Sequence, residues 1–201
     1  MASIYDLKTK FQALLRPLTN WLARRGVTAN QVTVAAVLLS VATGACLFVW
    51  PHELWPLLLV PAMLFFRMAL NAIDGMLARE HDMKSNLGAV LNELGDVISD
   101  AALYLPLALV PGFDPMLVIP AVLLAVISEM TGVVAIQIGG SRRYEGPMGK
   151  SDRAFAFGLL CFLIGCGVPR GQWLDIALRL ILILLVATIY NRARRALNEV
   201  A

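Results

Sequence analysis

The sequence predicts an all-α integral membrane protein in which six transmembrane helices follow an N-terminal amphipathic helix lying in the membrane interface. Of its 201 residues, 59% are hydrophobic, and the mean hydropathy is +0.72. A water-soluble domain of this length has no core large enough to bury that much apolar surface. Long apolar runs separated by clusters of basic residues point to the same fold class.

Residues 1–25 are expected to form the amphipathic juxtamembrane helix. Apolar side chains recur there at helical spacing among basic ones, which is typical of a helix at the membrane surface. The apolar positions are Phe11, Leu14, Leu15, Leu18, Trp21 and Leu22, and the basic ones are Lys8, Lys10, Arg16, Arg24 and Arg25. Charges and a proline break the apolar stretch, which disfavours a cleavable signal peptide.

Residues 26–201 are expected to form one transmembrane domain, because no repeat or long linker divides them. The first span contains no charged residue, and it approaches the roughly 20 residues needed to cross a bilayer. Thr28 and Asn30 are candidates to cap its N-terminus. The six expected spans are Val32–Trp50, Leu57–Arg79, Leu87–Pro111, Pro115–Ile138, Ala154–Val168 and Trp173–Tyr190.

The basic residues predict the orientation of these spans. Fourteen of the 17 Lys and Arg residues lie in the N-terminal segment, in the connections 79–84 and 142–153, or in the tail 192–195. The opposite connections hold only one. By the positive-inside rule, both termini of this multi-pass chain are cytoplasmic, in a membrane of the bacterial inner-membrane type. The tail 192–195 is expected to be solvated and to touch lipid heads.

Acidic residues interrupt the second and third spans. A carboxylate near the middle of a span costs about 2.5–3.5 kcal/mol, so such residues face a polar cavity or one another. The acids are Asp74, Glu93, Asp96 and Asp100. The short connection between these spans makes them antiparallel neighbours, and Arg67 in the second span is expected to pair with a buried acid.

Helical spacing places these polar residues in two stripes. Asn71 and Asp74 are three residues apart, whereas Gly88, Asn92, Asp96 and Asp100 follow one another at intervals of four. Carboxylates brought together at this depth need protons or a cation, and oxygen-only ligands favour magnesium, manganese or calcium. The three cysteines lie in apolar runs and the two histidines lie far apart, which excludes a disulfide framework and a zinc site.

The segment from Asn71 to Asp96, NAIDGMLAREHDMKSNLGAVLNELGD, carries a family resemblance. It resembles the CDP-alcohol phosphatidyltransferase signature, Asp-x-x-Asp-Gly-x-x-Ala-Arg, eight residues, then Gly-x-x-x-Asp-x-x-x-Asp. The matching positions are Asp74, Gly75, Ala78, Arg79, Gly88 and Asp96, whereas Asn71 and Asn92 stand at the first and third aspartate positions. The segment 28–33 and the Gly149–Lys150 pair are similar to further family elements.

This resemblance implies phospholipid biosynthesis. The family transfers a phosphatidyl group from CDP-diacylglycerol to an alcohol hydroxyl and releases CMP, at an intramembrane site facing the cytoplasm. By resemblance, the residues that hold Mg²⁺ or Mn²⁺ are Asp74, Asp96, Asn71 and Asn92. The affinity for the metal is expected to be lower than with the full family signature, because amides replace two of its carboxylates. The resemblance also implies that Asp96 is the catalytic base, with Asp100 as the alternative. It implies that Gly75, Ala78, Arg79 and Gly88 bind the CDP-lipid, and the chain is expected to form a homodimer.

The acceptor-binding candidates are the basic residues Lys150, Arg153, Arg142 and Arg143. They have the charge to hold a phosphorylated or otherwise anionic acceptor. The alternative is that they belong to the positive-inside excess and contact anionic lipid heads. For Glu129 in the fourth span, three interpretations stay open, which are a protonated carboxyl, a hydrogen bond between helices and a catalytic role.

Two other classes of function compete with the transferase. A cation- or proton-coupled transporter also buries carboxylates, but no internal repeat or pair of broken helices is visible. A family member that has lost catalysis and binds lipid as a subunit is compatible with Asn71 and Asn92. The basic residues follow membrane topology rather than a soluble face, so no nucleic-acid partner is expected.

Overall fold

The computed structural model describes residues 4–201, with side chains from residue 10 onward. Met1–Ser3 of the expected juxtamembrane segment and the side chain of Lys8 therefore lie outside the described residues. The described chain contains no strand. Its helices are α1 (Ile4–Arg24), α2 (Ala29–Val49), α3 (Trp55–Glu80), α4 (Asn86–Tyr104), the 3₁₀-helix η1 (Leu105–Leu109), α5 (Pro115–Gln137), α6 (Lys150–Gly165) and α7 (Gln172–Val200).

Four of these helices, α2, α3, α5 and α7, are long and apolar enough to cross a membrane. They expose large apolar side chains such as Leu38, Phe66, Leu123 and Ile183, each more than half accessible. Such outward-facing apolar surface is favourable in lipid and unfavourable in water. The predicted class, an all-helical membrane protein, is confirmed.

The helices that correspond to the third and sixth expected spans end elsewhere than those spans. The third helix ends at Tyr104 and continues as the 3₁₀-helix η1, because Pro106 cannot donate an N–H and its ring collides with the preceding turn of an α-helix. The last helix, α7, continues to Val200 instead of stopping at Tyr190. Its final residues are mostly good helix formers such as Ala, Arg, Leu and Glu, so nothing in the sequence terminates it earlier.

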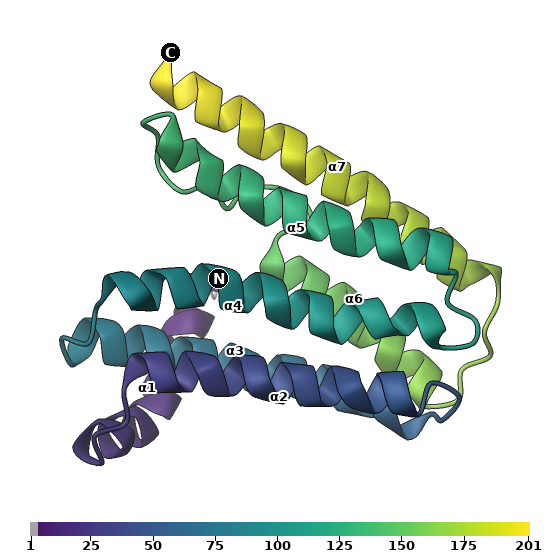
Figure 1. The fold of residues 1–201 in the computed structure, drawn as a ribbon, viewed down its shortest axis with the longest axis horizontal. Coiled ribbons are helices and arrows are strands. Elements are labelled where there is room, and N and C mark those ends of the chain that lie inside the picture. The colour runs from purple at the N-terminus through teal and green to yellow at the C-terminus, as the bar shows by residue number, and fades with distance from the viewer. Residues whose placement is uncertain (1–3) are drawn as a thin grey trace. The chain divides into compact units, whose positions relative to one another are not determined.

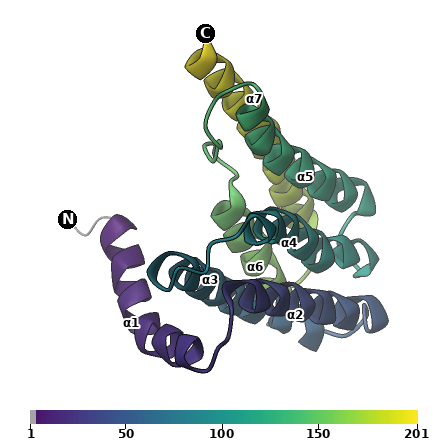
Figure 2. The same cartoon turned by 60° about the vertical axis from the view of Figure 1, so that its left-hand side comes forward.

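The chain divides into two compact units, of which the first comprises Met1–Ser40 and Met63–Ser99. Its core joins the start of α2 to the C-terminal half of α3, with Val32, Ile73 and Leu77 among the buried residues. In Figure 2, α1 crosses the direction of α3 rather than running alongside it. An ion pair fastens α1 to the end of α3, with 2.9 Å between Arg16 Nη2 and Glu80 Oε1.

The second unit comprises Val41–Ala62 and Asp100–Ala201. Its helices α5 and α7 lie side by side in both ribbon views (Figures 1 and 2). The ring of Tyr104 stacks on that of Phe157, with 4.2 Å between the ring centroids. Gly44 of α2 lies against the backbone of Ala102, where a Cβ atom would overlap the carbonyl oxygen.

Substituting Gly44→Ala is expected to destabilise the protein by about 1–3 kcal/mol, because the added methyl group collides with a backbone atom that cannot rotate away. Thermal unfolding in a fixed detergent measures the effect. Gly171→Ala is the matched control, since a Cβ atom there has only an ordinary contact with Trp173. Equal midpoints for the two variants would show that α2 and α4 have room to separate at this point.

Candidate functional site

The first polar cluster lies in the first unit, on α3 and α4. Asp74 is buried, and its Oδ2 atom accepts a hydrogen bond from the Thr33 hydroxyl at 2.8 Å. Nη2 of Arg67 donates to the Asp96 carboxylate at 3.2 Å and to the Asp96 carbonyl oxygen at 3.0 Å. The Asn71 amide donates to the same carboxylate at 3.5 Å. Arg67 therefore pairs with an acid as expected, although Asp96 is half-buried rather than buried, and the polar residues of the two helices meet at Asp96.

The candidate metal ligands of this cluster are the oxygen atoms of its carboxylate and amide side chains. Oxygen is the type of ligand that a hard divalent cation prefers. Among the described residues, however, no three His, Cys, Asp or Glu side chains come together as a metal site. Two of the four signature positions are neutral amides, and Asn92 is exposed. The charge of Arg67 also offsets that of Asp96. The oxygen atoms present therefore fit Mg²⁺ or Mn²⁺ in kind, with less negative charge than four carboxylates would supply.

The small residues of the signature lie against specific neighbours. A Cβ atom on Gly75 would be 3.1 Å from both terminal nitrogens of Arg79, so that guanidinium lies across the glycine. A Cβ atom on Gly88 would be 2.7 Å from Oδ1 of Asn30. Ala78 packs against the core of the first unit. The glycine positions thus leave room for polar side chains of the protein itself.

The helix cap at the start of α2 positions Asn30 beside Gly88. The hydroxyl of Thr28 accepts from the backbone N–H of Gln31 at 3.3 Å, and the Gln31 side chain accepts from the backbone N–H of Thr28 at 3.0 Å. This reciprocal pair is a capping box. Thr28 is thus the cap, whereas Asn30 faces Gly88 and Ser85, with 3.5 Å between Asn30 Nδ2 and Ser85 Oγ.

A second polar cluster lies in the second unit, where three buried or nearly buried arginines surround Glu129 of α5. We call Arg142, Arg153, Arg192 and Glu129 the arginine cluster. The distances from the Glu129 carboxylate are 2.7 Å to Arg142, 2.8 Å to Arg153 and 3.3 Å to Arg192. Of the open interpretations for Glu129, the structure therefore bears out bonding between helices, and it leaves a catalytic role untested.

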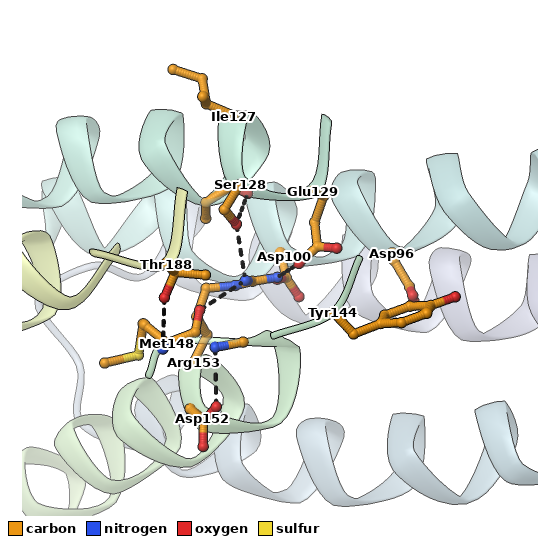
Figure 3. Close-up of polar contacts among 12 residues, drawn as sticks. Asp96, Asp100, Ile127, Ser128, Glu129, Tyr144, Met148, Asp152, Arg153 and Thr188 are labelled. Carbon is orange, nitrogen blue, oxygen red and sulfur yellow. Dashed lines mark hydrogen bonds and ion pairs between the residues drawn. The ribbon is translucent and has the colours of Figure 1, made fainter. Parts of the chain in front are cut away.

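Arg153 of α6 is the centre of this cluster, and only 1% of its surface is exposed. Its Nε and Nη2 atoms donate to Asp100 at 3.1 and 2.9 Å, and Nη2 also donates to Glu129. Its Nη1 atom donates to the Ser128 hydroxyl and to the Met148 carbonyl oxygen, each at 3.3 Å. Figure 3 shows this side chain between Asp100, Ser128 and Glu129. Because a guanidinium has five N–H donors, all the donors of Arg153 have partners within the protein.

The expectation of a solvated tail was wrong for Arg192. Its side chain is 1% exposed, and it donates to the carbonyl oxygens of Ser128, Tyr144 and Glu145. A signal for this burial was present in the sequence. Arg192 continues the buried face of α7 at helical spacing from Leu185 and Thr188.

The other predicted basic residues lie beside the arginine cluster. Arg143 pairs with Glu145, and its Nη1 atom is 2.7 Å from Glu199 of α7. Partial desolvation raises the pKa of Glu145, but hydrogen bonds from the backbone and from Arg143 outweigh it and lower the pKa overall. Lys150 is the first residue of α6, after Gly149, whose N–H donates to Asp152 at 3.0 Å. Of the four acceptor-binding candidates, the structure thus joins Arg142 and Arg153 through Glu129 and places Arg143 in a separate pair.

The fold and its polar clusters define a helical membrane protein with a carboxylate pair on two consecutive helices and a buried arginine cluster. Residues 26–190 match the CDP-alcohol phosphatidyltransferase family. The chain belongs to this family, and the resemblance seen in the signature segment is confirmed.

Individual relatives agree with the family match. The chain is 46% identical over 195 residues to inner membrane protein YnbA of Escherichia coli K12, covering 97% of this chain and 96% of the relative. It is 26% identical to the phosphatidylinositol phosphate synthase of Mycolicibacterium smegmatis, covering 96% of this chain and 88% of that one. Membrane residence is thus supported by a relative as well as by the helices.

Solved structures give the same fold. The Mycobacterium tuberculosis phosphatidylinositol phosphate synthase with CDP-DAG bound has a TM-score of 0.73 and 26% identity, covering 90% of this chain and 92% of that one. A structure of the same synthase in complex with manganese and citrate has a TM-score of 0.74 and 23% identity, covering 90% and 88% of the two chains.

Proposed function

We propose that the chain transfers a phosphatidyl group from CDP-diacylglycerol to the hydroxyl of a small alcohol and releases CMP. The observation that supports this most is the signature segment. Its two remaining carboxylates, Asp74 and Asp96, lie on consecutive helices, buried or half-buried, and they are held by Thr33, Arg67 and Asn71. Carboxylates placed inside a membrane protein are expected to serve chemistry rather than packing.

Asp96 is the proposed catalytic base. In this role, its carboxylate takes the proton of the acceptor hydroxyl while the hydroxyl oxygen attacks the phosphorus on the lipid side and the bond to CMP breaks. Asp100 is the alternative base. Its Oδ2 atom accepts two N–H groups of Arg153, whereas the Asp96 carboxylate accepts one from Arg67 and one from Asn71.

Gly75, Ala78, Arg79 and Gly88 are the proposed binding residues for the CDP-lipid. Arg79 is exposed at the end of α3, where its guanidinium is available to a diphosphate. The acceptor is proposed to bind near Lys150, Arg153, Arg142 and Arg143, with Glu129 among them.

A divalent cation, Mg²⁺ or Mn²⁺, is proposed to bind at Asp74, Asp96, Asn71 and Asn92. When bound, such an ion neutralises diphosphate charge and stabilises the departing CMP. The chain contributes the oxygen ligands for this ion. Arg67 adds a positive charge beside Asp96 whether or not an ion is bound.

Restoring both carboxylates, Asn71→Asp with Asn92→Asp, is expected to raise the affinity for Mn²⁺ at least about tenfold, because each substitution adds a full negative charge among oxygen ligands. Titration calorimetry with MnCl₂ in detergent measures the change without any turnover. Asn198→Asp, at an exposed position near the end of α7, is the control for added charge. Equal affinities for the native and doubly substituted proteins would remove these positions from the ligand set.

The proposed topology has six transmembrane helices, α2 to α7, in a domain of residues 26–201, with residues 1–25 as an interfacial helix. Exposed apolar side chains on α1 support the interfacial placement, since Leu14 is 75% and Trp21 52% accessible. Both termini are proposed to face the cytoplasm of a bacterial-type inner membrane, and the chain is proposed to act as a homodimer. Cysteine labelling from either side of sealed vesicles tests the orientation.

A second candidate is a family member without transferase activity that binds lipid as a subunit. The ion pair of Arg67 with Asp96 favours it, because this guanidinium occupies the carboxylate proposed as the base. Purified protein with CDP-diacylglycerol, MgCl₂ or MnCl₂ and a panel of acceptors distinguishes the two. CMP release with at least one acceptor supports the transferase. CDP-lipid binding without CMP release supports the subunit.

A further inference from the structure

We infer that the acceptor alcohol of this chain is uncharged, because the anion position among the arginines is already filled by the carboxylate of Glu129. This inference rests on the proposed transferase function and on an acceptor that binds near the arginine cluster. Three guanidiniums around one point are the arrangement that recognises a phosphate or a carboxylate ligand. Here Glu129 occupies that point, at 2.7–3.3 Å from all three.

Most hydrogen-bond donors of Arg153 and Arg192 already have partners within the protein. All five N–H groups of Arg153 have partners in Asp100, Ser128, Glu129 and Met148. Arg192 donates to three backbone carbonyl oxygens and pairs with Glu129. A phosphate group would have to displace these partners before either arginine could bind it.

The guanidinium of Arg142 is also held by contacts within the protein. Arg142 donates to Glu129 and to the carbonyl oxygen of Arg143, and its guanidinium lies over the ring of Tyr144 at 4.5 Å from the centroid. Gly132 of α5 makes the space, because a Cβ atom there would overlap Nη1 of Arg142. The cluster is therefore assembled around the carboxylate of Glu129 and needs no anionic ligand to complete it.

Carboxylates of the chain lie against the arginine cluster and its neighbours. The three arginines face two carboxylates, Glu129 and Asp100, and the neighbouring Arg143 and Arg195 face Glu145 and Glu199. A phosphorylated acceptor would bring its charge next to these carboxylates, and like-charge contact of this kind costs several kcal/mol. A neutral polyol avoids that repulsion, and its hydroxyl groups can donate to the same carboxylates.

Matched acceptor pairs test the inference on the native protein. Glycerol is compared with glycerol 3-phosphate, and inositol with inositol phosphate, using CDP-diacylglycerol in detergent micelles and CMP release as the readout. The neutral member of at least one pair is expected to have a kcat/KM at least about tenfold higher than its phosphorylated partner. Preference for the phosphorylated member would overturn the inference.

The substitution Glu129→Gln removes the internal anion while keeping the shape of the side chain. It is expected to shift the ratio of kcat/KM values toward the phosphorylated acceptor by about tenfold or more. Glu53→Gln removes one charge at an exposed position between α2 and α3, and it should leave the ratio unchanged. An unchanged ratio in Glu129→Gln would overturn the inference, and if that variant fails to fold, the native comparison still decides.

A binding measurement separates this inference from the transferase proposal. The thermal midpoint of unfolding is recorded with glycerol or glycerol 3-phosphate at matched ionic strength, which requires no turnover. Glycerol 3-phosphate is expected to stabilise Glu129→Gln more than the native protein. Absence of CMP release with every acceptor rejects the transferase alone. Stabilisation of the native protein by glycerol 3-phosphate to the same extent as the variant rejects the uncharged acceptor.

Discussion

Replacement of Asp96 by Asn lowers kcat for CMP release by about 10²–10⁴-fold, the range that a positioned general base contributes. The amide keeps the size of the side chain and its place beside Arg67 and Asn71, but it cannot take a proton from the acceptor hydroxyl. KM for CDP-diacylglycerol should change far less, since the proposed lipid-binding residues are Gly75, Ala78 and Arg79 on α3 and Gly88 on α4. Initial rates over a range of both substrates, in one detergent, separate the two parameters.

Asp100→Asn is the informative comparison, because Asp100 lies one turn later on α4. It removes a partner of Arg153 and is expected to lower stability more than kcat. A loss of kcat confined to Asp100→Asn would transfer the base to that residue. Retained kcat in both variants would reject a carboxylate base on α4 altogether.

Replacement of Arg153 by Met destabilises the protein by about 3–5 kcal/mol, the cost of leaving one member of a buried ion pair without its partner. The side chain is 1% exposed and lies 2.9 Å from Asp100 and 2.8 Å from Glu129. Glu129 keeps Arg142 and Arg192, so most of the cost should fall on Asp100. Unfolding free energies from denaturant titration in mixed micelles measure it.

Two further variants show whether the buried pair is responsible. Arg195→Met removes an arginine whose side chain is 61% exposed and 3.6 Å from Glu145, and this change should stay within about 0.5 kcal/mol. Adding Asp100→Asn to Arg153→Met should recover part of the loss, because the uncompensated carboxylate is then gone. No loss in Arg153→Met, or no recovery in the double variant, would show that the charges are screened by water.

The helices could be predicted from the sequence, because apolar runs of membrane-spanning length and the prolines and glycines between them act locally. The ends of two helices were harder to predict. Pro106 converts the end of the third span into a 3₁₀-helix, and nothing stops α7 before Val200. The signature positions from Asp74 to Asp96 were likewise readable, since fixed spacing along two helices defines a stripe.

The partners of the charged residues could not be predicted, because a pairing across helices depends on tertiary packing. Arg67 was expected to find an acid, but the sequence did not say which one. The helical spacing of Arg192 from Leu185 and Thr188 indicates its burial, but it does not identify Glu129 as its partner. Glu129 and Arg153 are separated by 24 residues, and no local pattern joins them.

The transferase proposal is tested most directly by CMP release from CDP-diacylglycerol in vesicles containing only this protein, MnCl₂ or MgCl₂ and a panel of alcohols. The product lipid is identified by mass spectrometry. We expect CMP and a new phospholipid to form in equal amounts with a neutral alcohol, and to disappear together in Asp96→Asn. Bound CDP-diacylglycerol that stays intact with every alcohol and both metals would show that this family member does not catalyse the transfer.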